Sequence, residues 1–347
     1  MFPDDFDGIL AGCPALDFNN LISWRASFYP ITGPIGSPDF ISNEKWINLI
    51  HNEILAQCDG LDGVMDGIIQ DPNLCKFRPE AIMCPDGRNS SASCLSPAQV
   101  EIVRKIFSPL YSIDGNIIYP AMQPGSEIMA VQKLYAGAPF SYSEDWFKYV
   151  VLNGPSWNAS TFNITDAALA EALNPDNIRT WPTTQLEPFF RTSDKTASHP
   201  LGRKLITYHG GQDNQITSFD TERFYNHLQK CMQASSAELD SYFRFFRIPG
   251  MFHCSTGPGA WVVGQGGSSS AKGLPFDPKL NILAALVEWV ENGLAPETIG
   301  GTKFVDDNVR NGVQYTRRHC KYPRRSTYMG GNATLESSWQ CLGDIAA

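Results

Sequence analysis

KLITYHG at residues 204–210 opens the part of the sequence that decides the fold. This short apolar run predicts a buried strand, the amphipathic SFDTERFYNHLQKCM at 218–232 predicts a helix, and SYFRFFRIPG at 241–250 predicts a second strand. PKLNILAALVEWVENG at 278–293 predicts a further helix, which Gly293 ends. This alternation of strands and helices predicts a parallel α/β sheet.

Two polar residues follow the two predicted strands. Asp213 comes just after the first strand, and His253 comes just after the second. Because ligands and catalytic groups gather at the carboxyl ends of the strands in open parallel sheets, we expect these side chains to meet. An acid followed by a histidine is the order found downstream of the serine in α/β-hydrolases, where the carboxylate holds the imidazole in the tautomer that accepts a hydroxyl proton. An ordinary turn aspartate and a loop histidine are the alternative.

HCSTG at residues 253–257 raises a competing assignment, in which Ser255 is the nucleophile. The nucleophile elbow of α/β-hydrolases has the pattern Gly-x-Ser-x-Gly on a sharp turn from a strand into a helix. His253 occupies the place of the first glycine, and the residues after Ser255 do not predict a helix. No complete Gly-x-Ser-x-Gly occurs among the 347 residues. We therefore interpret Ser255 as a loop residue and expect a serine nucleophile to lie outside the given sequence, with Ser255 in a rearranged site as a weaker hypothesis.

The composition is that of a globular protein, with 42% hydrophobic and 18% charged residues. A formal net charge of -9 without long runs of Lys or Arg argues against nucleic acid as a partner. No uninterrupted apolar stretch is long enough to cross a bilayer, so we expect no membrane partner either. The composition leaves the oligomeric state open.

QCDGLDGVMDGIIQDPNLC at residues 57–75 combines carboxylates with glycines. Asp59, Asp62 and Asp66 can converge with peptide carbonyls on one hard cation, and calcium prefers such oxygen ligands. The segment is not an EF-hand loop, because the acids do not alternate and Gln70 stands where a bidentate glutamate is required. A solvated acidic turn is the alternative. Cysteines flank the cluster, and a disulfide between them would lower the cost of ordering the loop.

Nine cysteines and four Asn-x-Ser/Thr sequons indicate an oxidising, glycosylating route, so we expect a secreted protein. The N-terminal MFPDDFDGIL has no features of a secretory signal, and we interpret the sequence as lacking its N-terminal end. Local pairing of the cysteines leaves Cys13, Cys231 and Cys254 over. A metal site at His253 and Cys254 is not expected, because no second ligand pair with zinc spacing occurs. The predicted disulfides are Cys58 with Cys75, Cys84 with Cys94 and Cys320 with Cys341, and the predicted glycosylation sites are Asn89, Asn158, Asn163 and Asn332.

Together these residues resemble the tannase and feruloyl esterase family, a set of secreted α/β-hydrolases with a large lid. The similarity covers nearly the whole chain and begins at FPDDFDGILAGCPALDFNN, residues 2–20, which resembles the family's segment after the nucleophile helix. The resemblance implies that Asp213 in GGQDNQI and His253 in FHCSTGPG are the acid and the histidine of a catalytic triad. It also implies that Cys254 forms a disulfide with the cysteine directly before the nucleophile, in a Gly-Cys-Ser-x-Gly-Gly elbow upstream of Met1.

The resemblance further implies a structural calcium site in the lid, away from the chemistry. Its ligands are the side chains of Asp59, Asp62 and Asp66 and the main-chain carbonyls of Val64 and Ile68. No other cofactor is implied.

The implied fold is an α/β-hydrolase core, partial because its N-terminal strands are missing, with a large loop-rich, mostly helical lid domain inserted. Residues 1–20 and 201–347 belong to the core, and residues 21–200 form the lid. The implied reaction is the hydrolysis of small phenolic-acid esters, feruloyl or galloyl, from plant cell walls or tannins, through an acyl-serine intermediate. A catalytically inactive secreted fragment that binds calcium or another ligand is the alternative from a different class.

Overall fold

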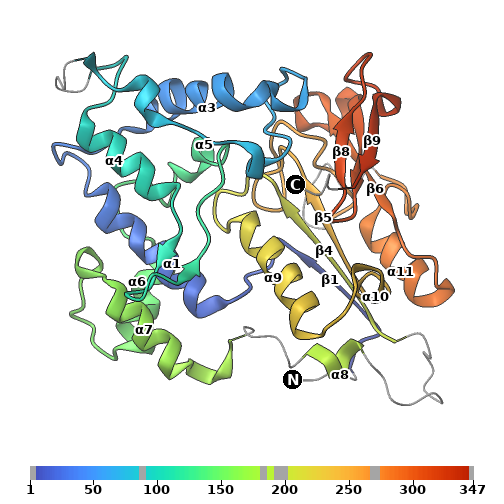
Figure 1. Cartoon of the computed structure of the whole chain (residues 1–347), viewed down its shortest axis with the longest axis horizontal. Helices are drawn as coiled ribbons and strands as arrows, with labels where there is room; N and C mark the ends of the chain where they lie inside the picture. Colours follow the sequence, from blue (N-terminus) through green and yellow to red (C-terminus); the bar gives the residue numbers. More distant parts are fainter. Residues whose placement is uncertain (1–4, 86–90, 180–185, 191–201, 266–273, 344–347) are drawn as a thin grey trace.

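A computed structural model describes residues 5–85, 91–179, 186–190, 202–265 and 274–343. Its central feature is a parallel sheet in the order β1-β4-β5, formed by β1 (Gly8–Gly12), β4 (Lys204–Gly210) and β5 (Phe243–Ile248) (Figure 1). The middle strand β4 is buried along almost its whole length, as is usual for a parallel strand covered on both faces. The two strands predicted from the sequence and their parallel pairing are confirmed.

Two helices flank these strands where the sequence predicts them. They are α9 (Ser218–Cys231) and α11 (Ile282–Asn292). Thr217 and Asn281 precede them and accept hydrogen bonds from the first free amides, which is the preferred chemistry of a helix N-terminus. Gly293 ends α11 in the left-handed conformation, with φ at 71°, as predicted from its position.

The chain between β1 and β4 is largely helical, and much of it lies beside the sheet (Figure 1). Its longest helix, α1 (Phe18–Thr32), is buried at most positions, and Trp24 packs edge-on against Phe28 with ring centroids 4.8 Å apart. These rings belong to an apolar core that extends to Tyr135. Besides several short 3-10 turns, the described elements of this region also include α2 (Asn43–Lys45), a π-helical turn (Trp46–Ile50), α3 (His51–Cys58), α4 (Pro97–Ile106), β2 (Leu110–Tyr111), β3 (Ile117–Tyr119), α5 (Glu127–Ala130), α6 (Ser141–Asp145), a second π-helical turn (Trp146–Val151), α7 (Ile164–Leu173) and α8 (Glu187–Phe190).

Two antiparallel strand pairs follow α11, and the sequence analysis did not predict them. β6 (Thr298–Phe304) pairs with β7 (Val313–Cys320), and β8 (Arg325–Tyr328) pairs with β9 (Trp339–Leu342). A short helix, α10 (Ser236–Leu239), precedes β5. An isolated bridge joins Phe246 of β5 to Lys321, the residue after β7, so the first of these pairs packs against the parallel sheet. Another bridge joins Val262 to Thr302 of β6.

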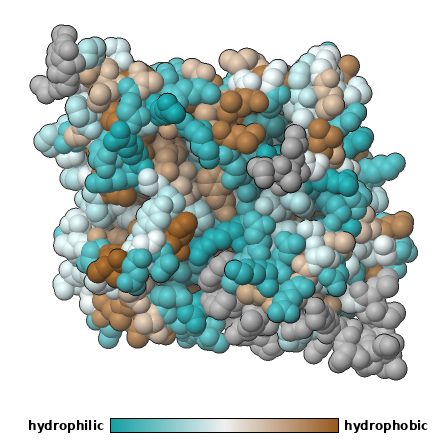
Figure 2. Space-filling model, in the orientation of Figure 1, coloured by the Kyte–Doolittle hydropathy of each residue, from teal (hydrophilic) through white to brown (hydrophobic). Residues whose placement is uncertain are grey.

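The three local disulfides predicted from the sequence are confirmed. Cys58 bonds to Cys75, Cys84 to Cys94, and Cys320 to Cys341. Cys13, Cys231 and Cys254 are free thiols. In the described part of the chain, no helix is both long and apolar enough to cross a membrane. Figure 2 shows a face on which hydrophilic residues separate several small apolar patches.

Candidate active site

The turns that follow β4 and β5 lie against each other. Gly210 and Ile248, at the ends of the two strands, are partners in the parallel register. Gly210 allows the close approach, because a Cβ atom there would lie 2.2 Å from the carbonyl oxygen of Phe252. The strand ends therefore bring the turn that carries Asp213 next to the turn that carries His253.

Asp213 and His253 form a hydrogen-bonded pair at this edge of the sheet. Nδ1 of His253 lies 2.8 Å from Oδ2 of Asp213. The aspartate side chain is fully buried, whereas 34% of the histidine side chain is exposed. Asp213 and His253 therefore meet at the carboxyl edge of the sheet, as expected from their positions after the two predicted strands.

The Asp213 carboxylate is held by its own turn as well as by His253. Oδ1 accepts hydrogen bonds from the amides of Gln215 at 2.7 Å and Ile216 at 2.9 Å. Burial by itself would raise the pKa of Asp213, but the hydrogen bonds from His209 and His253 hold it below its usual range. The carboxylate is therefore ionised and fixed in orientation.

His209 is a contact of this carboxylate that the sequence analysis missed. It is fully buried in β4, and its Nε2 lies 3.1 Å from Oδ2 of Asp213. Its Nδ1 lies 2.7 Å from the hydroxyl of Thr221 in α9. The hydroxyl can donate to Nδ1, which leaves Nε2 protonated toward the carboxylate. The sequence does contain a signal for this contact, namely a histidine inside a strand predicted to be buried. A buried polar side chain requires a hydrogen-bond partner.

The remaining nitrogen of His253 is available for chemistry. Because Nδ1 donates to Asp213, the neutral ring carries its free lone pair on Nε2. A lone pair held in this way can accept a proton from a hydroxyl group, and the buried carboxylate then stabilises the imidazolium. The pair can therefore act as a general base and its orienting acid.

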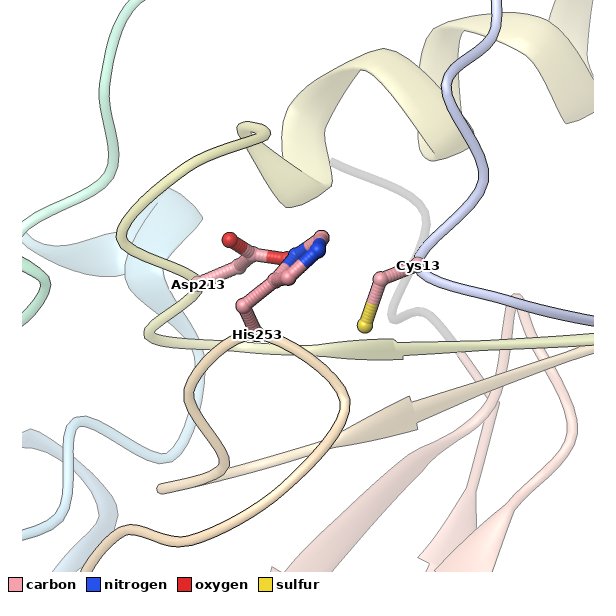
Figure 3. A group of neighbouring side chains, drawn as sticks. All are labelled: Cys13, Asp213 and His253. Carbon is pink, nitrogen blue, oxygen red and sulfur yellow. The ribbon is translucent and has the colours of Figure 1, made fainter. Parts of the chain in front are cut away.

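Cys13 lies on the other side of the His253 ring from Asp213 (Figure 3). It directly follows β1, and its amide donates to the carbonyl of Tyr208 in β4 at 2.8 Å. Its Sγ lies within 4.8 Å of donor atoms of both Asp213 and His253. Burial, followed by contact with the Cys254 thiol, raises the pKa of Cys13 well above its usual range. The sequence analysis left Cys13 unassigned, because its neighbours here are some 200 residues or more away along the chain.

A cleft of about 520 Å³ is lined by Gln212 and Phe252, the chain neighbours of Asp213 and His253. Its lining includes His51 and Met129 from the helical region and Gln212, Phe252 and Thr256 from the two turns. A space of this size is typical of sites for small organic ligands. A substrate in this cleft would reach the turns that hold the base.

Ser255 lies in an irregular turn, in agreement with its interpretation as a loop residue. Residues 254–261 form bends without a helix, and the next helix of the described chain is α11. A nucleophile elbow needs a helix directly after the serine. The local structure at Ser255 is therefore not an elbow.

The predicted calcium ligands lie in a loop that the disulfide between Cys58 and Cys75 closes. Asp59 and Asp62 are the ends of a 3-10 turn, and the amides of Val64 and Ile68 donate to the carboxylates of Asp62 and Asp66.

The Asp66 carboxyl in this loop is partly buried and lies among other charged groups. Burial, followed by the charges of Asp62 and Asp59, raises the pKa of Asp66 to about 6, although Arg317 opposes the shift. Within the described residues, however, only Cys13, Asp213 and His253 place three such donor atoms within 4.8 Å of one another. The carboxylate oxygens of Asp59, Asp62 and Asp66 are therefore suitable ligands for a hard cation. They are farther apart, however, than the donor atoms of Cys13, Asp213 and His253.

A parallel sheet with a buried aspartate and a partnered histidine on successive turns at its carboxyl edge defines a protein of the α/β-hydrolase-like class. A model of the family described as tannase and feruloyl esterase matches residues 1–342. The chain belongs to this tannase and feruloyl esterase family.

Relatives and solved structures agree with this assignment. Probable feruloyl esterase B-2 of Aspergillus flavus is 60% identical over 321 residues, which cover 92% of this chain and 59% of that protein. The crystal structure of feruloyl esterase B from Aspergillus oryzae is similar with a TM-score of 0.88 and 42% identity, over 99% of this chain and 66% of that chain. The crystal structure of an esterase from Aspergillus oryzae gives a TM-score of 0.88 and 46% identity, over 98% of this chain and 65% of that chain. The chain spans about three-fifths of the length of the curated relatives it matches.

Proposed function

We propose that this chain carries the general base and the orienting acid of a carboxylic ester hydrolase that acts on esters of phenolic acids. The observation that carries the proposal is the 2.8 Å hydrogen bond from Nδ1 of His253 to the buried carboxylate of Asp213. Membership of the tannase and feruloyl esterase family, and the printed names of the relatives, support the substrate class.

The proposed mechanism uses a serine outside the 347 residues, since the sequence contains no Gly-x-Ser-x-Gly. Nε2 of His253 takes the proton of the serine hydroxyl while the serine oxygen attacks the ester carbonyl. The imidazolium then gives this proton to the leaving alcohol as the ester C–O bond breaks, and the acyl-serine remains. Water repeats the sequence and releases the phenolic acid, and Asp213 remains ionised throughout.

A second proposal concerns the acidic loop, where Asp59, Asp62 and Asp66, with the carbonyls of Val64 and Ile68, would hold a structural calcium ion. The mutual repulsion of the carboxylates and the closing disulfide support this proposal. A bound calcium ion would neutralise that repulsion and order the loop.

We also propose that the protein is secreted and glycosylated. The three disulfides support an oxidising compartment. Asn158, Asn163 and Asn332 are exposed, as acceptor sites must be, and Asn89 lies outside the described residues. Mass spectrometry of the protein from its own culture medium tests both points.

The catalytic proposal is tested by His253→Ala in a polypeptide that contains this chain together with the coding sequence upstream of Met1. We expect the rate of hydrolysis of methyl ferulate or methyl gallate to fall roughly 10⁴- to 10⁶-fold, on the scale of other triad members. His227→Ala is the matched control, because this histidine lies on α9, where its ring contacts Cys231. Turnover near that of the control, in a variant with an unchanged melting temperature, would refute the role of His253.

The location of the serine has a separate test. We expect the transcript upstream of Met1 to encode a Gly-Cys-Ser-x-Gly-Gly segment, and a fluorophosphonate to label that serine. Labelling of Ser255 instead would overturn the assignment of the nucleophile. The role of His253 as the base would still be tested separately by His253→Ala.

A further inference from the structure

A buried glutamate holds the imidazole of His51 at the wall of the cleft that Gln212 and Phe252 line. Nδ1 of His51 lies 2.5 Å from Oε1 of Glu127, whose side chain is fully buried, while 14% of the His51 side chain is exposed. The other carboxylate oxygen of Glu127 accepts a hydrogen bond from the amide of Gly125 at 2.8 Å. Because Nδ1 donates to Glu127, Nε2 is the nitrogen of His51 that is left for a ligand in the cleft.

Gln212 forms a second polar part of the same wall. The residue is only 1% exposed, and among the described residues neither Oε1 nor Nε2 of its side chain has a hydrogen-bond partner. The amide packs beside Gly125, where a Cβ atom would lie 2.4 Å from Nε2 of Gln212. Buried polar groups normally have partners, and turning this amide toward the cleft breaks no hydrogen bond. The side chain can therefore offer a ligand both a donor and an acceptor.

The cleft lies beside the turn that carries the proposed catalytic acid. Gln212 directly precedes Asp213 in the chain, and Nε2 of Gln123 donates to the main-chain carbonyl of Asp213 at 2.5 Å. This bond joins the acid's turn to the segment that leads to Gly125 and Glu127. A ligand that contacts His51 and Gln212 is therefore held between the helical region and the catalytic turn.

The rest of the cleft is suited to a neutral ring. Two of its lining residues, Lys303 and Asp307, pair with each other, with Nζ 2.6 Å from Oδ1. A charged ligand would therefore compete with an ion pair that is already formed. Apolar side chains line much of the remaining surface, and small-molecule sites commonly combine such a surface with a few polar groups. These apolar residues are Leu55, Ile128, Met129, Phe252 and Pro258.

We propose that this cleft binds the ring of the phenolic acyl group, and that His51 and Gln212 recognise the oxygen atoms on that ring. The ring hydroxyl donates to Nε2 of His51, and the amide of Gln212 donates to the neighbouring hydroxyl or methoxy oxygen. His51 and Gln212 are then specificity-determining residues. The inference rests on the proposed esterase activity, because the ring belongs to the substrate of that reaction.

The first test measures binding without ester hydrolysis. The probes are 2-methoxy-4-methylphenol and 3-methylanisole, which differ by the ring hydroxyl, and proton NMR titrations of the polypeptide that includes the upstream coding sequence give both affinities. We expect the phenol to bind about 5- to 10-fold more tightly, the gain from one net hydrogen bond.

Two variants assign this preference to the two side chains. Gln212→Leu removes the amide, and His51→Asn removes Nε2 while keeping a donor for Glu127. Each should bring the ratio of the two affinities toward one. Gln340→Leu, at an exposed position in β9, is the matched control and should keep the ratio of the parent. Melting curves establish that each variant is folded.

The second test compares methyl ferulate with methyl cinnamate, which lacks both ring oxygens. In each variant we expect the ratio of kcat/KM for ferulate to that for cinnamate to fall about 5- to 10-fold, mainly through KM for ferulate. Damage to the turn of Asp213 would lower kcat for both esters and leave this ratio unchanged. The ratio therefore separates recognition of the ring from a structural effect beside the acid.

Equal affinities of the folded parent for the two probes would overturn the proposal. So would parent ratios retained in both Gln212→Leu and His51→Asn, and His51→Asn alone is decisive if the buried Gln212 variant does not fold. A polypeptide that distinguishes the probes but hydrolyses neither ester would refute the proposed function and keep the ring site. Ester hydrolysis with equal probe affinities would refute the ring site alone.

Discussion

His209 and Asp213 are joined by a buried hydrogen bond of 3.1 Å between Nε2 and Oδ2, on the same carboxylate oxygen that His253 contacts. His209 is a positioning residue in this arrangement, since it lies within β4 and its other nitrogen contacts Thr221. The Asp213 carboxylate is thus hydrogen-bonded both by His209 of strand β4 and by the backbone amides of its own turn.

His209→Ala should lower the free energy of unfolding by about 2 to 4 kcal/mol. The substitution leaves the Thr221 hydroxyl without its partner and removes one donor from a buried carboxylate, and unpaired buried groups cost about 1 to 3 kcal/mol each. Urea unfolding measures the change. His227→Ala, at a partly exposed site, should stay within about 0.5 kcal/mol of the parent. Equal losses in the two variants would show that the buried contact contributes nothing.

The sequence predicted the elements that position this pair because their signals are local. β4 and β5 are continuous apolar runs, and α9 and α11 combine a periodic apolar face with capping residues. The three disulfides were predictable for the same reason, since each closes a loop of 10 to 21 residues.

Features that depend on distant pairing were not predictable from one sequence. β7 reads VQYTRRHC, and most of its residues are polar or charged even though Arg317 and His319 are buried, so its pairing with β6 carries little apolar signal. Cys13 reaches His253 only because β1 pairs with β4, which a reading of spacing along the chain cannot detect.

Asp220 predicts a pH dependence of stability. Burial, followed by the charge of Asp17, raises the pKa of Asp220 from 3.8 to about 8, although Nη1 of Arg223 lies 3.7 Å away. Between about pH 4 and pH 8 the folded state keeps a proton that the unfolded chain releases. The free energy of unfolding should therefore fall as the pH rises through this window, and the penalty is complete above about pH 8.

Asp220→Asn should remove this dependence. The variant should be more stable than the parent at about pH 9 and close to it at about pH 4, because the amide cannot ionise. Thermal melts across the pH range give the comparison. Asp39→Asn at an exposed site is the control and should follow the parent at every pH. A parallel shift of the Asp220→Asn curve at all pH values would contradict the assignment of the proton.

Calcium should raise the melting temperature of metal-stripped protein, because a ligand bound only to the folded state stabilises it by about 2.7 kcal/mol at 100 times its dissociation constant. Asp62→Ala should abolish most of this rise, since it removes one of three carboxylates in the loop closed by Cys58 and Cys75. Asp39→Ala is the matched control for loss of an exposed acid. Identical calcium shifts in the two variants would place the ion elsewhere.

Asp213→Asn tests the hydrogen-bond pattern of the proposed active site. The amides of Gln215 and Ile216 both donate to Oδ1, so the asparagine carbonyl should take that place. Its amino group then faces the nitrogens of His253 and His209, which donate to Oδ2 in the parent. His253 can keep a hydrogen bond only by accepting at Nδ1, which moves its proton to Nε2.

In that tautomer His253 has no lone pair on Nε2 to receive the serine proton. We expect kcat for the proposed ester hydrolysis to fall on the order of 10⁴-fold, as in other triads with this substitution, with little change in KM. The nitrogen chemical shifts of His253 should report the change of tautomer directly. A variant that keeps the parent tautomer and yet loses activity would show that the charge of Asp213, rather than its geometry, supports the base.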